Sequence, residues 1–310
     1  MRKLPQVEHI YQNHHLDSTR WDHFRPRVGD IVIATPIKSG TTWTQAIVLH
    51  LIAQDGQKRD IWKNSIWLDW RGDPLSNVMD ALEAQSQRRV IKTHLPLDGL
   101  RYLADIKYIV VGRDARDVFM SLWNHYSNYT AEFMELLSST PGRVGEPLPE
   151  APADIHAFWR KWTSSGWFAW ETEGYPFWSN LRHVQTWWNH RHLPNILFVH
   201  YNALLANMPR EIERIASYLD IKLSKSMRDD IAELVSFSSM KRDAEQINPD
   251  SQFVFKGGPS TFINKGTNGR WREILSAADL ELYHAAARRE LSVDAQEWLE
   301  TGGLKQHLSH

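Results

Sequence analysis

The segment that most restricts the fold is residues 31–48, IVIATPIKSGTTWTQAIV, in which a strand-like run passes through a short polar loop into a helix-like run. The first run is rich in Ile and Val without alternation, which is typical of parallel strands covered on both faces. The loop therefore follows the carboxyl end of a strand and precedes a helix N-terminus. Open α/β sheets bind their ligands at that edge.

Further runs of the same two kinds alternate along the chain. Apolar runs predict strands over 30–35, 89–93, 107–111 and 195–200, and helical patterns cover 43–54, 114–126, 180–190 and 209–219. This alternation predicts an α/β protein with a parallel central sheet flanked by helices in three layers.

Composition excludes several classes of protein. The chain has 310 residues, enough for one large core, and a formal net charge of −1, which gives no argument for nucleic acid or a membrane as partner. The absence of cysteine excludes disulfides, thiolate metal sites and cysteine nucleophiles. We expect no secretory leader and no membrane span, and therefore a soluble cytoplasmic protein.

Two segments rich in Gly and Pro read as loops within a single domain over 1–310. Residues 138–153 predict a surface insertion, a flap over a site, because strands and helices continue beyond it. Residues 248–269 predict a second loop that contributes to the site. Many of the 15 Trp lie within 159–188, which also reads as a loop, and this favours the lining of an apolar pocket over core packing.

The polar loop of the first segment carries the residue types of a phosphate site. Gly40 permits close approach of the backbone, and N–H groups from Ser39 to Thr42 are expected to point toward an anion. Lys38 adds a cation, and Ser39, Thr41 and Thr42 add hydroxyl donors. The pattern is not a Walker loop, because Lys38 precedes Gly40 and no earlier glycine is present. An ordinary ATPase or GTPase is disfavoured, while a relative of the nucleotide kinases stays open.

Lys92 and His94, in KTHLP at the end of the weakest predicted strand, form a second set. Residues two apart on an extended chain project to the same face. A neighbouring ammonium lowers the pKa of an imidazole, and a neutral imidazole can accept a proton. We therefore predict that His94 is a general base.

Arg113 and Ser121 form a third set, just past the next strand and on the following helix. A guanidinium suits bidentate contact with a phosphate. With the loop at Lys38, this places two anion-binding sets at adjacent strand ends. A nucleoside with phosphate groups at both ends would satisfy both sets.

In their order and spacing, these motifs resemble those of the cytosolic-type sulfotransferases, which use 3′-phosphoadenosine 5′-phosphosulfate (PAPS), and of a bacterial-like member of that family. The family's TYPKSGTTW appears as TPIKSGTTW at 35–43, its KTHLP is intact at 92–96, and its RNAKDVxxS appears as RDARDVFMS at 113–121. The resemblance covers most of the chain and implies the P-loop-kinase-like sulfotransferase fold.

Two later motifs extend the resemblance to the adenine. ILFVHYNAL (196–204) implies that Tyr201 lies near the adenine. VSFSSM (235–240) implies that Phe237 lies on one adenine face, opposite Trp43 on the other.

A third motif, NKGTNGRW near the C-terminus, resembles the family's RKGxxGxW and implies contacts of Lys265 and Gly266 with the 3′-phosphate. Asn264 stands where the family has an arginine that holds this phosphate. We expect one of two nearby basic residues to supply the missing charge, Arg270 or Lys256.

The resemblance implies direct transfer of a sulfuryl group from PAPS to a hydroxyl or amine, with no metal ion. His94 would take the acceptor's proton, Lys38 would stabilise the leaving 5′-phosphate, and Lys92 would contact the sulfuryl oxygens. Arg113 and Ser121 would hold the 3′-phosphate. Positioning and charge stabilisation would then supply most of the catalysis.

The acceptor is predicted less closely. The family's substrate-gating aromatic falls in SIWLDW (65–70), at Trp67. With the Trp-rich segment, this favours a small, largely apolar or planar acceptor such as a phenol, a hydrophobic alcohol or an arylamine. Sugars also stack on Trp, so a carbohydrate acceptor stays open.

Members of the family dimerise through a KxxxTVxxxE segment. Here the charged residues at its two ends are kept, but its central Thr-Val pair is replaced, so a homodimer is possible but not established. The equivalent positions are Arg272, Ser276, Ala277 and Glu281. Two other functions also stay open: a nucleotide or small-molecule kinase of related fold, and a catalytically silent PAPS-binding protein. A kinase would need carboxylates for Mg²⁺ and a Walker loop.

Overall fold

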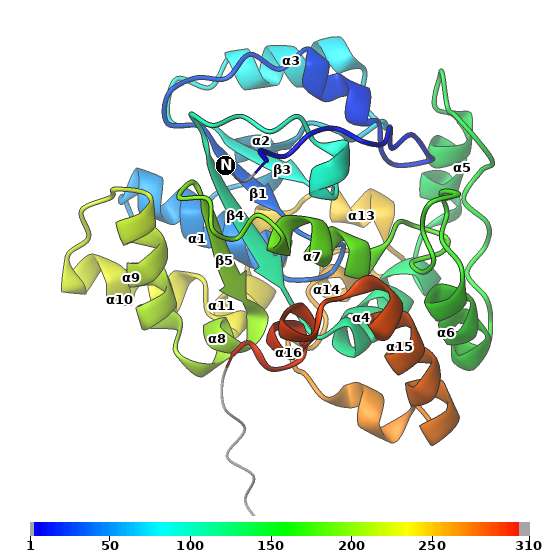
Figure 1. Ribbon diagram of the computed structural model, residues 1–310. Coiled ribbons are helices and arrows are strands. Elements are labelled where there is room, and N and C mark those ends of the chain that lie inside the picture. Colours follow the sequence, from blue (N-terminus) through cyan, green and yellow to red (C-terminus); the bar gives the residue numbers. More distant parts are fainter. Residues whose placement is uncertain (1–2, 304–310) are drawn as a thin grey trace, which may run out of the picture.

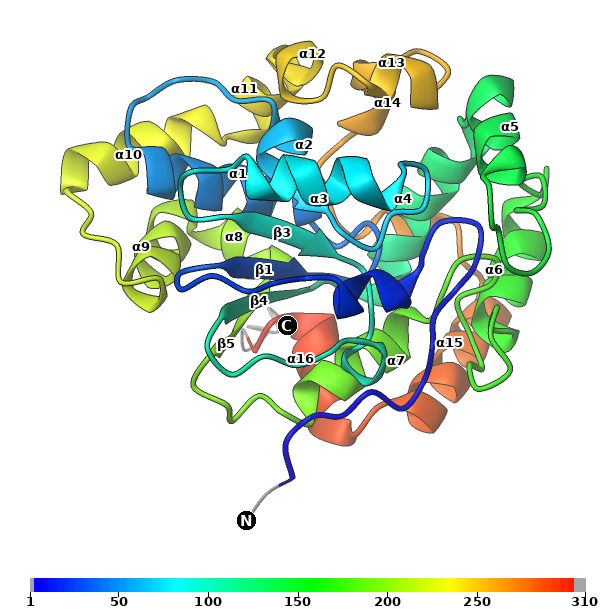
Figure 2. The ribbon, with the colours of Figure 1, turned by 90° about the horizontal axis from the view of Figure 1, so that it is seen from above.

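The centre of the computed structural model, which describes residues 3–303, is one five-stranded sheet. The strand order is β2-β3-β1-β4-β5, and every neighbouring pair is parallel (Figures 1 and 2). The strands are β1 (Ile31–Ala34), β2 (Ser65–Trp67), β3 (Val90–Thr93), β4 (Lys107–Gly112) and β5 (Ile196–His200). The predicted α/β class with a parallel central sheet is confirmed.

Helices connect the strands and cover both faces of the sheet (Figure 1). They are α1 (Thr41–Ala53), α2 (Ile61–Asn64), α3 (Leu75–Glu83), α4 (Ala115–Ser127), α5 (Ala131–Ser139), α6 (Ile155–Ser164), α7 (Asn180–Trp188), α8 (Tyr201–Ala206), α9 (Met208–Tyr218), α10 (Lys225–Leu234), α11 (Phe237–Arg242), α12 (Ala244–Ile247), α13 (Ser251–Val254), α14 (Pro259–Phe262), α15 (Ala277–Glu290) and α16 (Val293–Thr301). Short 3-10 turns lie at Ser18–Asp22, Leu97–Gly99 and Arg270–Glu273.

The central strands are buried on both faces because successive side chains point to opposite sides of a sheet. In β1, Ile31 and Ile33 belong to the hydrophobic cluster formed with α1, α9 and α10. Val32 and Ala34 belong to the cluster formed with α4, α7 and α15. Figure 1 shows these two groups of helices on opposite sides of the sheet, which gives the three predicted layers.

The register brings the ends of three strands to one edge of the sheet. Ala34 pairs with Thr93 of β3 on one side and with Val110 of β4 on the other. The loop before α1, the residues after Thr93 and the turn before α4 therefore leave the sheet side by side. The predicted site motifs occupy these three segments.

A buried ion pair lies at the opposite edge of the sheet. Asp30 lies just before β1, and its carboxylate pairs with Arg89 at 2.6 Å.

The predicted strands and helices begin and end within a few residues of the observed ones, and one strand was not predicted. Asp114 caps α4 through Arg116 N–H, as expected from its place before the helix. The strand β2 was missed because three residues give no usable periodicity.

The prediction that 159–188 is a pocket-lining loop is wrong. The segment contains most of α6 and all of α7, and four of its Trp rings are at most 2% exposed. These buried rings are Trp159, Trp162, Trp178 and Trp187. Helical spacing places Trp159, Trp162 and Trp187 on the inner faces of α6 and α7, and Trp178, just before α7, packs in the same core.

The two Gly- and Pro-rich segments behave differently from each other. Residues 138–139 end α5, and the rest of 138–153 runs between α5 and α6 without helix or strand (Figure 1). No residue of this segment lines the cavity described below, so the expected flap is wrong. Residues 248–269 contain the short helices α13 and α14, and part of this segment does line the cavity.

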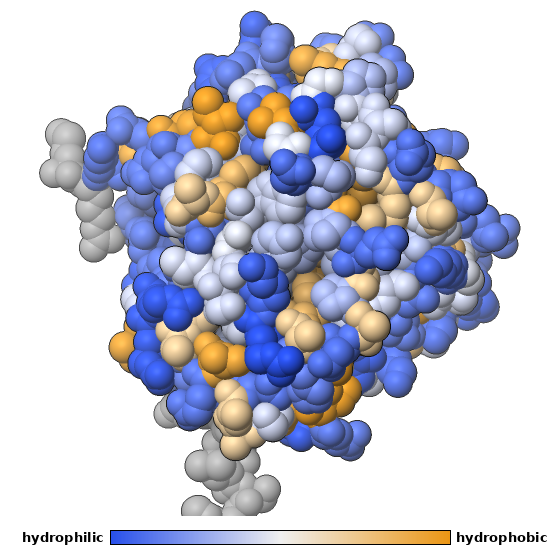
Figure 3. Space-filling model, turned by 90° about the vertical axis from the view of Figure 1, so that its right-hand side faces the viewer, coloured by the Kyte–Doolittle hydropathy of each residue, from blue (hydrophilic) through white to orange (hydrophobic). Residues whose placement is uncertain are grey.

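Within 3–303, no helix has both the length and the hydrophobicity that a membrane crossing requires. The face that carries α5 and α6 is mostly hydrophilic, and its hydrophobic residues lie in small separate groups (Figure 3).

Candidate active site

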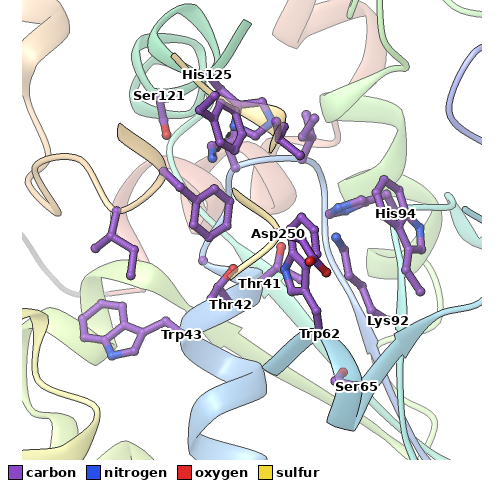
Figure 4. A pocket seen from close by; sticks show the side chains of 18 of the residues that line it. Thr41, Thr42, Trp43, Trp62, Ser65, Lys92, His94, Ser121, His125 and Asp250 are labelled. Atoms are coloured by element: carbon purple, nitrogen blue, oxygen red, sulfur yellow. Dashed lines mark hydrogen bonds between the residues drawn. The ribbon is translucent and has the colours of Figure 1, made fainter. Parts of the chain in front are cut away.

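A cavity of about 680 Å³ lies at the edge of the sheet where the predicted motifs meet. All but one of the predicted site residues line it: Lys38, Gly40, Thr41, Thr42, Trp43, Lys92, His94, Arg113, Ser121, Tyr201, Phe237, Lys265 and Gly266. Figure 4 shows Lys92 and His94 at one end of this cavity and Trp43 and Ser121 at the other. Residues from distant parts of the sequence therefore form one elongated site.

The loop before α1 is held in a conformation that leaves N–H groups free. Lys38 (φ 66°) and Gly40 (φ 102°) are both left-handed. Gly40 is the N-cap of α1 and has no capping side chain, so the N–H groups of Thr41 and Thr42 have no acceptor in the described chain. A Cβ at Gly40 would lie 2.9 Å from Tyr201 Cδ2, so glycine is required here. Free N–H groups at a helix N-terminus form an anion site.

Ser39 departs from the prediction. Its side chain does not line the cavity, and its N–H donates to Pro36 O at 3.3 Å instead of pointing toward a ligand. The left-handed conformation of Lys38 turns the chain back at this point. The row of N–H groups available to an anion therefore begins at Gly40.

His94 is held in one tautomer. Its Nδ1–H donates to Thr35 O at 2.7 Å, so Nε2 carries the free lone pair. The Thr35 hydroxyl lies 3.2 Å from the same Nδ1 and 2.6 Å from Thr41 Oγ1, which ties the imidazole to the first turn of α1. Burial, followed by the charge of Lys92, lowers the pKa of His94 well below its usual value. The imidazole is therefore neutral, as the sequence predicted, although burial outweighs the neighbouring lysine.

Lys38 and Lys92 are half-buried in the wall of the cavity, and neither forms an ion pair with a carboxylate in the described chain. Burial and the mutual repulsion of cations lower the pKa of Lys38 to about 7, and burial lowers the pKa of Lys92 to about 7. Lys38 Nζ lies 3.0 Å from His125 Nδ1. Lys92 Nζ lies 3.8 Å from the centre of the Trp67 ring, a cation–π contact.

Arg113 is a third cation in the cavity, and it is buried. Its guanidinium donates to Asn268 Oδ1 at 2.8 and 3.0 Å and to Thr267 O at 3.1 Å, and it stacks 4.2 Å from the Tyr201 ring. These neutral partners orient the group and leave its charge uncompensated by an ion pair. Burial lowers the pKa of Arg113 from its ordinary value.

The residues expected around an adenine lie together. The Trp43 ring meets the Tyr201 ring edge-on at 5.3 Å, and its Nε1–H donates to Val235 O at 2.7 Å. Phe237 packs over Gly266, where an added Cβ would come within 2.3 Å of the ring. Glycine at 266 thus lets the Phe237 ring pack directly against the backbone at the wall of the cavity.

Of the two basic residues expected to compensate for Asn264, only Arg270 lines the cavity. Arg270 lies close enough to Arg113 to lower that group's pKa, and its Nη2 donates to Met120 O at 3.1 Å. Lys256 is exposed and does not line the cavity. Of the two residues, Arg270 is therefore the one placed to supply the charge that is missing at Asn264.

The end of the cavity beyond His94 is aromatic. Trp67 meets the His94 ring edge-on at 4.9 Å and stacks on Trp70, also at 4.9 Å, while Trp70 stacks on Phe133 at 6.1 Å. The sequence pointed to Trp67 but gave no signal for the rest of this wall.

Several lining residues had no motif to mark them. They include His15, Trp62, Trp70, His125, Tyr129, Phe133, Asp250 and Phe255. They come from the N-terminal segment, α2, the loop after β2, α4, α5 and the 248–269 segment, and only the fold brings them together.

The cavity is suited to a ligand that carries several negative charges. Its basic residues Lys38, Lys92 and Arg113 lack carboxylate ion pairs in the described chain, and leaving poorly solvated charges unpaired costs free energy. Free N–H groups at α1 add a cradle for a phosphate, and the rings near Trp43 leave room for a base. The fold and site define an enzyme that binds an anionic nucleotide and moves a group from it to a second ligand.

Comparison with known proteins gives the family. The sequence profile of the sulfotransferase domain matches residues 28–295. A glycolipid sulfotransferase of Mycobacterium tuberculosis is 30% identical over 308 residues, which cover 94% of each chain. Sulfotransferase 1B1 of Mus musculus is 29% identical, over 89% of this chain and 87% of that protein. The chain therefore belongs to the sulfotransferase family, and it is a PAPS-dependent sulfotransferase.

Solved structures agree on the fold. The mouse sulfotransferase SULT7A1 complexed with 3′-phosphoadenosine 5′-phosphate (PAP) has a TM-score of 0.68 at 20% identity, over 90% of this chain and 91% of that one. Retinol dehydratase complexed with androsterone and PAP gives the same TM-score at 23% identity. PAPS is the co-substrate, and the uncompensated cations of this cavity suit its phosphate and sulfate groups.

Proposed function

We propose that this enzyme transfers the sulfuryl group of PAPS directly to a hydroxyl or amine of a small, largely apolar or aromatic acceptor. The observation that carries the proposal is the position of His94. Its Nε2 is left without a partner, its ring packs against Trp67 of the aromatic wall, and Lys92 and Lys38 are near enough to lower its pKa. A base at that position can take a proton from an acceptor held against the wall.

Residues at successive positions along the cavity would have different roles in the transfer. Bound PAPS supplies an activated sulfuryl group between its phosphate and the acceptor. Lys38 and the N–H groups after Gly40 would hold the 5′-phosphate, and Lys92 would face the sulfuryl oxygens. His94 Nε2 would accept the proton that the acceptor loses. These groups are fixed before the ligands arrive, so they stabilise developing charge without reorganising.

The far end of the cavity would bind the rest of the nucleotide. Arg113 and Ser121 would hold the 3′-phosphate, with Arg270 in the place of the missing arginine. Trp43, Tyr201 and Phe237 would enclose the adenine, and two further contacts, from Lys265 and Gly266, would complete this end.

A glycolipid is the second candidate acceptor. The mycobacterial relatives named glycolipid sulfotransferases cover 94% of this chain at 30–31% identity. The cavity rim also carries exposed polar side chains of Asp73, Asn77 and Asp250 around the stacked tryptophans. Aromatic platforms with polar neighbours suit a sugar as well as a phenol.

The test is a transfer assay with PAPS, in which the release of PAP and the sulfated product are measured for 2-naphthol, a long-chain alcohol, an arylamine and a glucosyl lipid. We expect transfer to 2-naphthol, and we expect EDTA to leave the rate unchanged, whereas the kinase alternative requires Mg²⁺. Tight PAP binding without transfer to any of these acceptors would favour the silent PAPS-binding alternative. Transfer to the glucosyl lipid alone would replace the aromatic acceptor by the second candidate.

The single domain over 1–310, the cytoplasmic location and the homodimer remain predictions. The four positions of the dimer segment are exposed, and Ser276 caps α15. A mass measured by light scattering during size-exclusion chromatography would decide the oligomeric state.

A further inference from the structure

His15 is a buried residue of the cavity that no part of the proposed transfer uses. It is 2% exposed, lines the cavity, and comes from an N-terminal segment outside the sheet. Its backbone is fixed by its own N–H, which donates to Asn13 Oδ1 at 2.9 Å, and by its carbonyl, which accepts from Arg71 N–H at 2.9 Å. The position of the imidazole is therefore set by the fold.

A relay of hydrogen bonds fixes the tautomer of this imidazole. His14 Nε2 lies 2.8 Å from Pro176 O, and because a carbonyl only accepts, His14 Nε2 carries the proton. His14 Nδ1 is then a lone pair, and it contacts His15 Nδ1, which must donate. His15 Nε2 is consequently left as a hydrogen-bond acceptor.

That acceptor has no partner. His15 Nε2 is buried, and no donor in the described chain reaches it. The surrounding rings are those of Trp70, Tyr129, Phe133, Phe177 and Trp178, at centroid distances between 5.4 and 6.3 Å. Burial lowers the pKa of both His14 and His15, so this cage holds neutral rings. An unpaired buried acceptor costs free energy that a ligand donor would recover.

His15 and the proposed base His94 pack against the same tryptophan. The rings of His15 and His94 both pack against Trp178, at 6.0 and 5.7 Å, and both border the tryptophan wall. Both imidazoles therefore belong to the aromatic end of the same cavity.

We propose that His15 Nε2 accepts a hydrogen bond from a second hydroxyl of the sulfuryl acceptor, so that the enzyme selects compounds with two hydroxyls on one ring system. The inference rests on the proposed function, because the hydroxyl that is sulfated is the one at His94. It names the acceptor class more narrowly: diphenols, or polyhydroxylated rings, over simple phenols and alcohols. His15 is a binding residue in this scheme, and the transfer step does not involve it.

The test compares binding of 2-naphthol and the dihydroxynaphthalene isomers to the enzyme–PAP complex, measured by calorimetry, so that the readout does not depend on transfer. We expect at least one isomer to bind about 10-fold or more tightly than 2-naphthol. His15→Phe, which suits the aromatic cage, should abolish the difference by weakening the diol alone, whereas Trp62→Phe, a change in the same cavity away from His15, should leave the ratio intact. Equal binding of all isomers and 2-naphthol, or an unchanged ratio in His15→Phe, would overturn the inference.

Two further results keep the test decisive. If His15→Phe does not fold, as judged by melting and PAP binding, His15→Gln and His15→Leu replace it. Glutamine keeps an oxygen acceptor and should retain part of the preference, while leucine should lose it, and equal ratios in both would contradict the inference. If the wild type binds the diols preferentially but sulfates neither them nor 2-naphthol, the proposed function fails while the role of His15 in binding stands. Equal sulfation of diols and 2-naphthol, with equal binding, rejects the role of His15 alone.

Discussion

Binding of PAP at pH 8 should draw a proton out of solution, because the free site holds a lysine that is largely uncharged at that pH. Burial, with the charges of Lys92 and Arg113, lowers the pKa of Lys38 to about 7. Such a group is about 10% protonated at pH 8 and about 50% at pH 7. A phosphate against Lys38 favours the ammonium form and raises this pKa by several units.

The protonation of Lys38 in the free and in the PAP-bound protein sets the size of the proton uptake and the pH dependence of the affinity. Uptake should approach about 0.9 proton per PAP at pH 8 and about 0.5 at pH 7. Because the bound protein holds the proton more tightly than the free protein, affinity is complete below pH 7 and is lost as the pH rises above it. The loss should be about tenfold per pH unit between pH 7 and the pKa of the bound state.

Titration calorimetry in two buffers of different ionisation enthalpy measures the protons taken up directly. Lys38→Met should remove most of the uptake at pH 8. Lys63→Met is the matched control, since Lys63 lies at the exposed rim of the same cavity and is paired with Asp60. No uptake by the wild type at pH 8, or undiminished uptake by Lys38→Met, would refute the reasoning.

Three other predictions follow from the same contacts. His94→Gln should lower the sulfation rate by about 10²–10⁴-fold and leave the PAP affinity within about twofold, as measured by transfer assay and calorimetry; a large loss of PAP affinity would contradict its role as base. Arg270→Ala should weaken PAP binding by about 10-fold or more while Lys256→Ala does not, and normal affinity in both variants would reject the compensation for Asn264.

The last of the three concerns stability. Burial raises the pKa of Glu171 to about 8, so its contribution to the stability of the fold is present at low pH and is lost as the pH rises from about 4.5 toward 8. Glu171→Gln should therefore raise Tm by about 2–4 °C at pH 8 and change it little at pH 5, as measured by calorimetry. A gain of the same size at both pH values would show that charge is not the cause.

That the residues proposed for the nucleotide share one cavity could be predicted from the sequence, because each of them belongs to a local motif at a strand end. Lys38, Lys92 and Arg113 each follow an apolar run closely, and parallel strands carry all such ends to one edge. Only Ser39 was misplaced, since the left-handed backbone at Lys38 cannot be read from residue types alone.

The acceptor end could not be predicted in the same way. The tautomer of His15 depends on Pro176, far along the chain, and the tryptophan wall depends on a three-residue strand with no periodicity. The prediction that the Trp-rich segment lines the pocket was wrong for a related reason. Trp159 lies outside every predicted helix, and its burial becomes clear only once α6 is known.

The two ends of the cavity are also built from different kinds of structure, and this affects how each end tolerates substitutions. The residues proposed to bind the phosphates lie at the ends of the inner strands β3, β1 and β4, where a substitution disturbs the sheet itself. The acceptor wall is assembled from the edge strand β2, an N-terminal segment and the helix α5, where side chains can change while the sheet stays intact. We therefore expect substitutions at the acceptor wall to alter acceptor choice at a smaller cost in fold stability than substitutions beside the central strands.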